Sequence, residues 1–446
     1  MTAAGRLRQL LAGSAGWLLV AMVALAIAHG VMPSMPSWPA GACAWLAGGL
    51  LLRRTRSTQQ ILLAVLIVLG GLAMVFSLSQ GVEPEWVHLL DANVPLLAMI
   101  ASVGFLRLVA GASETTGASL PVGFKAFRHT VFSVGILGSV INISAPILVG
   151  DRLAINGKLQ RLTSQTITRT FSACSAWSPF FGGMAMVLTY VSSASLNNVM
   201  LAGLPFALIG MTVIIIEARL RFRREVNNFR GYPISVSSLW VPVVLAGAVA
   251  LGSVLMPGVK ILYVIAIAAL LVVALVLVAR QSARGAVRTL HGHVRLGLPG
   301  MAGELLLFLG AGVLAVGLNG VVETGAIVLP IHSFSPTVAG ALLASIVLVS
   351  GLGLHPVISV AVVTPLLTPL DPSPTLLAVT FMFGWSLGTC ISPLSGTHLV
   401  FQGRFGVPSY QAAWWNLPYV LTMLVVGIAL LQIEPMIWHW WSPAFR

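Results

Sequence analysis

The residues best suited to binding chemistry are serines, prolines and glycines that recur with one spacing in two apolar segments. The residues that match without a gap are Ser172 with Ser386, Ser178 with Ser392, Pro179 with Pro393 and Gly182 with Gly396. A break inside a membrane helix leaves N–H donors at one half-helix start and C=O acceptors at the other half's end. The donors suit an anionic group and the acceptors a small cation. The two segments therefore predict a paired binding site, and the alternative is a pair of ordinary proline kinks.

Hydroxyl, glycine and histidine residues beside the breaks are the candidate binding residues, since glycine lets the backbone approach a ligand closely. Neither broken segment contains Asp or Glu. His398 could bind substrate, carry a proton or satisfy a neighbouring carbonyl. Arg169 is expected to snorkel to the cytoplasmic interface. The predicted substrate- and ion-binding residues at the breaks are Ser178, Gly182, Gly183, Ser392, Ser395, Gly396, Thr397 and His398.

These segments must lie in membrane helices, because 57% of the residues are hydrophobic, 8% are charged and the mean hydropathy is +0.97. The apolar runs are long enough to cross about 30 Å of hydrocarbon. They are continuous rather than alternating, which excludes a transmembrane barrel. Cys43, Cys174 and Cys390 lie in apolar surroundings and predict no disulfide framework. The fold class is therefore predicted to be an all-α polytopic membrane protein.

The positions of the basic residues predict the topology. Two apolar stretches, 121–157 and 335–370, are interpreted as re-entrant hairpins that return to the side they entered from. With the N-terminus cytoplasmic and the C-terminus outside, nearly all of the basic residues then lie on the cytoplasmic side. That bias sets orientation in an inner or plasma membrane, so the net charge of +13 indicates topology rather than nucleic-acid binding. The predicted spans, about eleven, are 15–33, 38–52, 60–79, 91–111, 160–192, 196–218, 237–255, 258–279, 298–320, 373–403 and 409–432.

The same pattern predicts two repeats after one leading helix. Each repeat has five spans and a hairpin, and an odd number of crossings makes the repeats inverted relative to each other. The predicted parts are the N-terminal helix (1–37), repeat 1 (38–218, with its hairpin at 121–157 and broken helix at 160–192), a basic cytoplasmic linker (219–236), repeat 2 (237–432, with its hairpin at 335–370 and broken helix at 373–403) and a Trp-rich tail (433–446).

The expected hairpin tips carry three further candidates for substrate or ion binding. Asn142 and Ser144 lie at the first tip and His355 precedes Pro356 at the second. The alternative for Asn142 is a plain turn-forming role, and the alternative for His355 is a cap at the turn.

This layout, together with the segment from Ser392 to Gly406, resembles the ion transporter superfamily, and its architecture is most like the divalent anion:sodium symporter branch. The resemblance implies an elevator mechanism, in which hairpins and broken helices move against a scaffold, and scaffolds of this kind commonly dimerise. The Ser-Asn-Thr triplets of the sodium-coupled branch are absent. The nearest equivalents are Asn142-Ile-Ser144 and Gly353-Leu-His355-Pro356. The sequence therefore allows either a proton or a sodium ion as the coupling ion.

Enzyme motifs are missing: the chain has no phosphate-binding loop with lysine, no His-Glu-x-x-His and no paired intramembrane aspartates. No enzyme activity, cofactor or metal site is predicted. The expected function is gradient-driven transport of a small organic anion across the inner membrane. The partners are that anion and membrane lipid, a homodimer is a candidate assembly, and nucleic acid is not expected. The alternatives are a cation/proton antiporter or metalloid-oxyanion exporter on the same scaffold, and a non-transporting assembly or lipid-handling protein.

Overall fold

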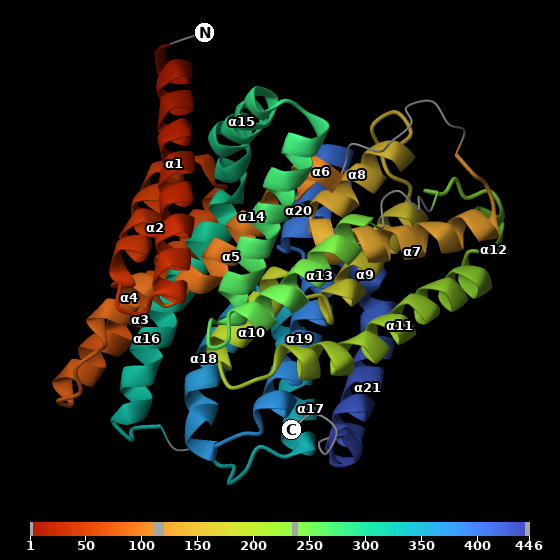
Figure 1. Cartoon of the computed structure of the whole chain (residues 1–446). Coiled ribbons are helices and arrows are strands. Elements are labelled where there is room, and N and C mark those ends of the chain that lie inside the picture. The colour runs from red at the N-terminus through yellow and green to blue at the C-terminus, as the bar shows by residue number, and fades with distance from the viewer. Residues whose placement is uncertain (1–2, 111–119, 234–239, 328, 442–446) are drawn as a thin grey trace. The chain divides into compact units, whose positions relative to one another are not determined.

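A computed structural model describes residues 3–110, 120–233, 240–327 and 329–441. Within these residues the chain is helical, and its only extended pairings are two isolated bridges, Val122 with Arg230 and Ile155 with Lys158. The all-α prediction is therefore confirmed. The helices, labelled in Figure 1, divide into two compact units.

Unit 1 comprises Met1–Val109, Val243–Pro330 and Ala361–Pro369. Its helices begin with a long N-terminal pair, α1 and α2, which lie side by side. The helices of unit 1 are α1 (Ala3–Val31), α2 (Trp38–Leu51), α3 (Ser57–Ser79), α4 (Trp86–Asp91), α5 (Val94–Gly104), α6 (Arg107–Ala110), α13 (Trp240–Leu255), α14 (Ile261–Arg280), α15 (Ala283–Gly292), a π-helical turn (His293–Gly297), a 3-10 turn (Leu298–Met301) and α16 (Ala302–Glu323).

Unit 2 comprises Ala110–Pro242, Ile331–Val360 and Leu370–Arg446, so it contains both broken helices, the first hairpin and the tip of the second. Its helices are α7 (Phe124–Ile141), α8 (Ser144–Leu153), α9 (Arg161–Ser175), α10 (Gly182–Tyr190), α11 (Leu196–Arg221), α12 (Arg223–Asn227), α17 (Pro336–Gly351), α18 (Pro356–Leu367, which continues into unit 1), α19 (Pro374–Ile391), α20 (Gly396–Phe405) and α21 (Ser409–Trp441).

In the described part of the chain, eight helical segments are long and apolar enough to cross a membrane, which makes the chain a multi-pass helical membrane protein. Three of the eleven predicted spans fall outside this group. Helix α2 has 14 residues and α13 has 16, and the span at 160–192 is divided into α9 and α10. The count of eleven and the inverted orientation of the repeats stay predictions.

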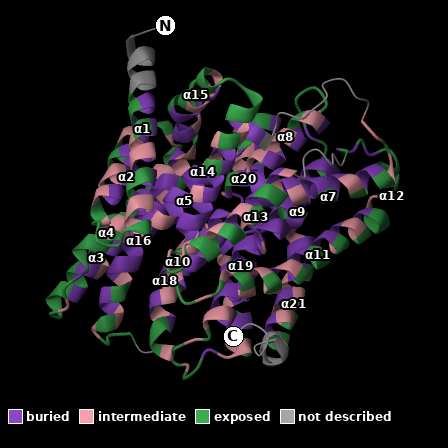
Figure 2. Ribbon diagram, in the orientation of Figure 1, coloured by how far each residue is buried: buried purple, intermediate pink, exposed green. Residues whose placement is uncertain are grey.

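The two units are built from matching helix pairs. In unit 1, α3 packs on α16 and α14 packs on α5. In unit 2, the first helix of each hairpin packs on the broken helix that follows it in the chain, α7 on α9 and α17 on α19. The broken helices α9 and α19 also pack on each other. Figure 2 shows α9 and α19 as mostly buried, whereas α3 exposes much of its apolar surface. The broken helices are therefore the core of unit 2.

Prolines explain where the two long helices break. Pro179 and Pro393 have no backbone N–H to donate and their rings clash with the preceding turn. Helix α9 therefore ends at Ser175 and α19 at Ile391. Helices α10 and α20 then begin at the matching glycines, Gly182 and Gly396. The residues between the half-helices, 176–181 and 392–395, are called break 1 and break 2 below.

Each predicted hairpin is a pair of helices joined by a short turn. The turn of the first contains Asn142, with φ of +51°, and the turn of the second contains Gly353, with φ of +107°. Asparagine and glycine tolerate this left-handed region better than other residues do. Ile143 follows Asn142 directly and Leu354 follows Gly353. We refer to 142–143 as tip 1 and to 352–355 as tip 2.

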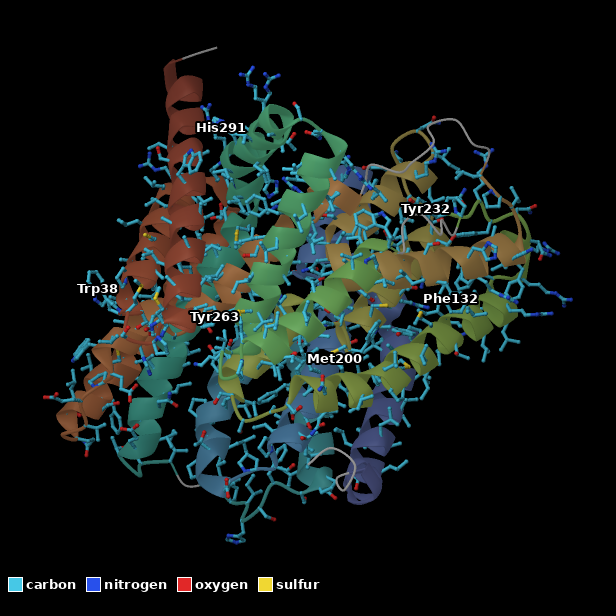
Figure 3. The ribbon with its side chains drawn as sticks, viewed as in Figure 1. Trp38, Phe132, Met200, Tyr232, Tyr263 and His291 are labelled. Carbon is cyan, nitrogen blue, oxygen red and sulfur yellow. The ribbon has the colours of Figure 1, made fainter. Side chains whose placement is uncertain are left out.

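Two of the predicted parts overlap helices. The predicted tail, 433–446, begins within α21, which continues to Trp441; the side chains of its tryptophans lie outside the described residues. The predicted linker, 219–236, begins within α11 and includes α12. It also pairs with the start of the first hairpin, where the backbone N–H of Tyr232 (Figure 3) donates to Thr130 Oγ1 at 2.8 Å.

Candidate functional site

The first broken helix touches the first hairpin through Ser178. The Ser178 side chain is fully buried and its Oγ donates a hydrogen bond to the backbone oxygen of Ser139 in α7. The same Oγ accepts from the backbone N–H of Phe180 at 3.3 Å. One hydroxyl therefore joins break 1 to the arm that leads into tip 1.

The second broken helix touches both hairpin tips. A Cβ added to Gly396, at the start of α20, would lie 3.7 Å from Ile143 Cδ1 in tip 1. A Cβ added to Gly353, in tip 2, would lie 3.6 Å from Leu394 Cδ1 in break 2. Gly396 is nevertheless exposed, so the start of α20 is accessible as well as close to tip 1.

Trp385 in α19 joins the start of α10, just after break 1, to tip 2. A Cβ added to Gly183 in α10 would lie 2.7 Å from the indole ring, so only glycine fits there without moving the tryptophan. The His355 ring also contacts Trp385 edge-on, with ring centroids 5.1 Å apart and an interplanar angle of 74°. Both breaks and both tips thus converge within unit 2.

The two serines that align in sequence also contact each other in space. Ser386 Oγ donates to the backbone oxygen of Ser172 at 2.7 Å, and Ser172 Oγ donates to the backbone oxygen of Ser386. These two hydrogen bonds hold the aligned positions of α9 and α19 against each other. The matched spacing therefore corresponds to a physical pairing of the two broken helices rather than to two unrelated kinks.

Two side chains cap break 2. Ser395 Oγ accepts from the backbone N–H of His398 at 3.4 Å, as an N-cap of α20. His398 Nδ1 lies 2.8 Å from the Ser392 backbone oxygen, and because a carbonyl can only accept, Nδ1 must carry the proton. Thr397 and Ser392 are buried beside them. His398 thus satisfies a carbonyl, which is one of its three predicted roles.

The remaining candidates lie at the hairpin tips. Asn142 and Ser144 are half-buried, and the Asn142 backbone oxygen accepts from Ala145 N at 3.0 Å. His355 Nδ1 accepts from the backbone N–H of Val357 at 3.3 Å, so the capping role occurs here. In a neutral ring this leaves the proton on Nε2. His355 can therefore cap tip 2 and still offer an N–H donor.

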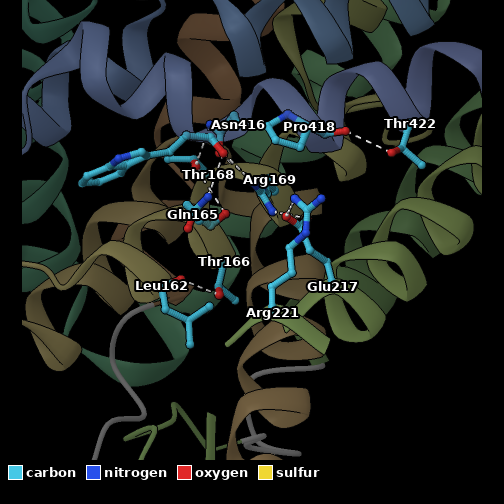
Figure 4. A network of polar contacts seen from close by, with 11 residues as sticks. Leu162, Gln165, Thr166, Thr168, Arg169, Glu217, Arg221, Asn416, Pro418 and Thr422 are labelled. Carbon is cyan, nitrogen blue, oxygen red and sulfur yellow. Dashed lines mark hydrogen bonds and ion pairs between the residues drawn. The ribbon is translucent and has the colours of Figure 1, made fainter. Parts of the chain in front are cut away.

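A buried polar network behind break 2 was not predicted from the sequence (Figure 4). Arg169 does not snorkel: its side chain is 4% exposed and pairs with Glu217 of α11 at 2.7 Å. Its Nε donates to Asn416 Oδ1 at 3.0 Å. Glu217, an acid within an otherwise apolar span, was the one sequence signal that could have indicated a partner for Arg169.

The chemistry available at the convergence is that of hydroxyls, backbone amides and imidazoles. Within the described residues, no three His, Cys, Asp or Glu side chains are grouped as they would be to hold a metal ion. N–H groups in the first turn of a helix have no partner within that helix. The exposed start of α20 therefore suits an anionic group better than it suits a cation.

The chain is similar in fold to a solved transporter structure. The crystal structure of the Alcanivorax borkumensis YdaH transporter, whose topology is described as unusual, matches with a TM-score of 0.53 and 15% sequence identity, over 85% of this chain and 98% of that one. No family model matches the chain. No curated protein sequence matches it either. At this identity the likeness shows a shared fold.

Proposed function

We propose that the protein is a secondary active transporter that moves a small organic anion, carboxylate-like in its charge, across the inner membrane. The observation that carries this proposal is the convergence of two broken helices and two hairpin tips within one compact unit. Broken helices at matching places in two halves are the usual binding elements of secondary transporters. The fold shared with a known transporter supports the same function.

The substrate charge follows from the groups that remain available. Gly396 and Thr397 start α20, and the exposed Gly396 backbone can approach a ligand without a side chain in between. Cation exchange usually requires a free acidic side chain in the membrane. The carboxylate behind break 2, Glu217, is already paired with Arg169 and Arg221. This engagement favours an anion carrier over a cation/proton antiporter on the same fold.

The division into two units supports an elevator mechanism as the mode of transport. Both breaks and both tips lie in unit 2, and the paired helices α3 and α16 lie in unit 1. We assign unit 2 as the moving part and unit 1 as the scaffold, with two inverted repeats, re-entrant hairpins and a homodimer as further parts of the proposal. The N-terminus is assigned to the cytoplasm and the C-terminus to the outside.

Uptake into liposomes under imposed gradients tests this function. The purified protein is reconstituted, and accumulation of radiolabelled mono- and dicarboxylates is followed under a proton gradient, a sodium gradient or neither. Accumulation that requires one gradient and is lost in Gly396→Val supports the proposal. Accumulation of no carboxylate, with gradient-driven movement of a cation instead, would establish the antiporter.

A further inference from the structure

In the hydrogen bonds behind break 2, the chemistry of the side chains determines which atom donates and which accepts. The Arg169 guanidinium can only donate, so the Asn416 oxygen that it contacts at 3.0 Å must be the amide oxygen Oδ1. The Asn416 amino group then faces the other way, where three acceptors surround its two hydrogens: the Cys390 carbonyl at 3.1 Å, Thr168 Oγ1 at 3.3 Å and His398 Nε2 at 3.3 Å. An amino group has only donors to offer, so its approach to His398 Nε2 favours a ring proton on Nδ1. The same conclusion follows from the Ser392 carbonyl, which accepts from Nδ1 at 2.8 Å.

Arg169 donates hydrogen bonds to three residues, which fix the position of its guanidinium. Besides Asn416, it donates to Glu217 Oε2 at 2.7 Å and to the Trp415 backbone oxygen at 2.6 Å. The network runs through α11, α9, α21 and α20 to break 2 and lies wholly in unit 2. The other charged or titratable groups that face it are Arg221, which pairs with Glu217, and Cys390 and Tyr419, which adjoin Arg169.

The network also occupies the carbonyl end of the first half-helix. Carbonyls at the C-terminal end of a broken helix are the groups that coordinate a cation in this kind of site. Here the Cys390 carbonyl accepts from the Asn416 amino group at 3.1 Å, and the Ser392 carbonyl accepts from His398. Two protein N–H donors thus meet the partial negative charge at the end of α19.

We propose that the His398 ring N–H takes the place of a coupling cation at break 2, and that Asn416 and Arg169 are positioning residues that hold His398 as the Nδ1–H tautomer. The inference rests on the proposed function, because it concerns the same breaks. It specifies that the second half of the site needs no sodium ion. It also leaves His355, rather than His398, as the histidine with a ring N–H available to a ligand.

The tautomer is measured directly by nitrogen-15 NMR of histidine-labelled full-length protein in lipid nanodiscs, with His398 assigned by its loss in His398→Gln. We expect the His398 proton on Nδ1 between about pH 5 and 8, the range in which a free imidazole titrates. Asn416→Asp keeps an oxygen for Arg169 but places an acceptor opposite Nε2. It should protonate His398 on both nitrogens within that range. The matched control is Asn228→Asp, at an exposed amide in the linker, which should change nothing.

A wild-type proton on Nε2, or an Asn416→Asp variant that folds and keeps the wild-type tautomer, would overturn the proposal. Melting temperature in sodium chloride against potassium chloride gives a second readout. His398→Ala frees the Ser392 carbonyl, so a sodium-specific rise in melting temperature is expected in this variant and not in the wild type. Any other pattern overturns the cation replacement. Neither readout uses a substrate, so failure here is distinct from failure of the proposed function.

Discussion

Replacing Arg169 should destabilise the protein far more than replacing a second ion-paired arginine, Arg404. Arg169→Gln leaves Glu217 without its buried partner, at a carboxylate that is 13% exposed, and removes donors from the Asn416 and Trp415 oxygens. Removing one partner of a buried ion pair costs about 3–5 kcal/mol. Because Arg221 still contacts Glu217 at 3.2 Å, we expect the lower end, about 3 kcal/mol.

The matched control has the same residue type and a shorter ion pair. Arg404 binds both Asp151 oxygens, at 2.6 and 2.7 Å, but the two side chains are 53% and 42% exposed. Exposed pairs contribute about 0–1 kcal/mol, so Arg404→Gln should cost no more than that.

Unfolding in mixed micelles by added dodecyl sulfate, followed by far-ultraviolet circular dichroism, gives the free energy of unfolding for each variant. A double-mutant cycle with Glu217→Gln isolates the pair, because the double variant no longer carries an unpaired buried charge. Arg169→Gln and Arg404→Gln variants that lose similar free energy, or a cycle with no interaction energy, would refute the burial of Arg169 and restore the snorkelling interpretation.

Three further predictions concern topology, the breaks and coupling. Single cysteines at both ends of the second hairpin should react with an impermeant reagent only from outside. Those at both ends of the first hairpin should react only from the cytoplasm. Labelling of the two ends of one hairpin from opposite sides would contradict the inverted repeat. The positions are Ser335 and Asp371 for the second hairpin and Arg128 and Lys158 for the first. Gly396→Val should abolish ligand binding with little change in melting temperature, since nothing lies nearer than 3.7 Å to the new Cβ. Gly183→Val should lower the melting temperature, because its side chain would push on Trp385. An equal loss of melting temperature in the two variants would make both positions structural. If protons drive uptake, His355→Gln should remove its pH dependence in liposomes, and strict sodium dependence with an unchanged pH profile in the variant would exclude that role.

The apolar runs and Ser-Pro-Gly spacing predicted the helices and their breaks because both depend on local chemistry. Continuous apolar residues define a membrane helix. Proline alone does not end a helix here, since α11 continues through Pro205, but the breaks combine Pro179 or Pro393 with a glycine three residues later. The pairing of Ser172 with Ser386 could be anticipated only through their alignment.

The network around Arg169 could not be anticipated in this way. Asn416 lies 247 positions from Arg169, in a helix whose sequence shows no distinguishing pattern. Its contact with His398 depends on how α20 and α21 pack, which no local propensity encodes. Arg169 was wrongly predicted to snorkel because that rule considers one helix in lipid, whereas α9 is surrounded by other helices of unit 2.

The central claim, that the converging breaks bind a small anion, is tested most directly by ligand-induced stabilisation of the purified protein. Carboxylates of different length and charge are added to the wild type and to Gly396→Val, and the melting temperature is followed. The account predicts that at least one carboxylate stabilises the wild type, by about 2.7 kcal/mol at a hundredfold excess over Kd, and leaves Gly396→Val unchanged. Stabilisation by no carboxylate, or equal stabilisation of the wild type and the variant, would contradict it.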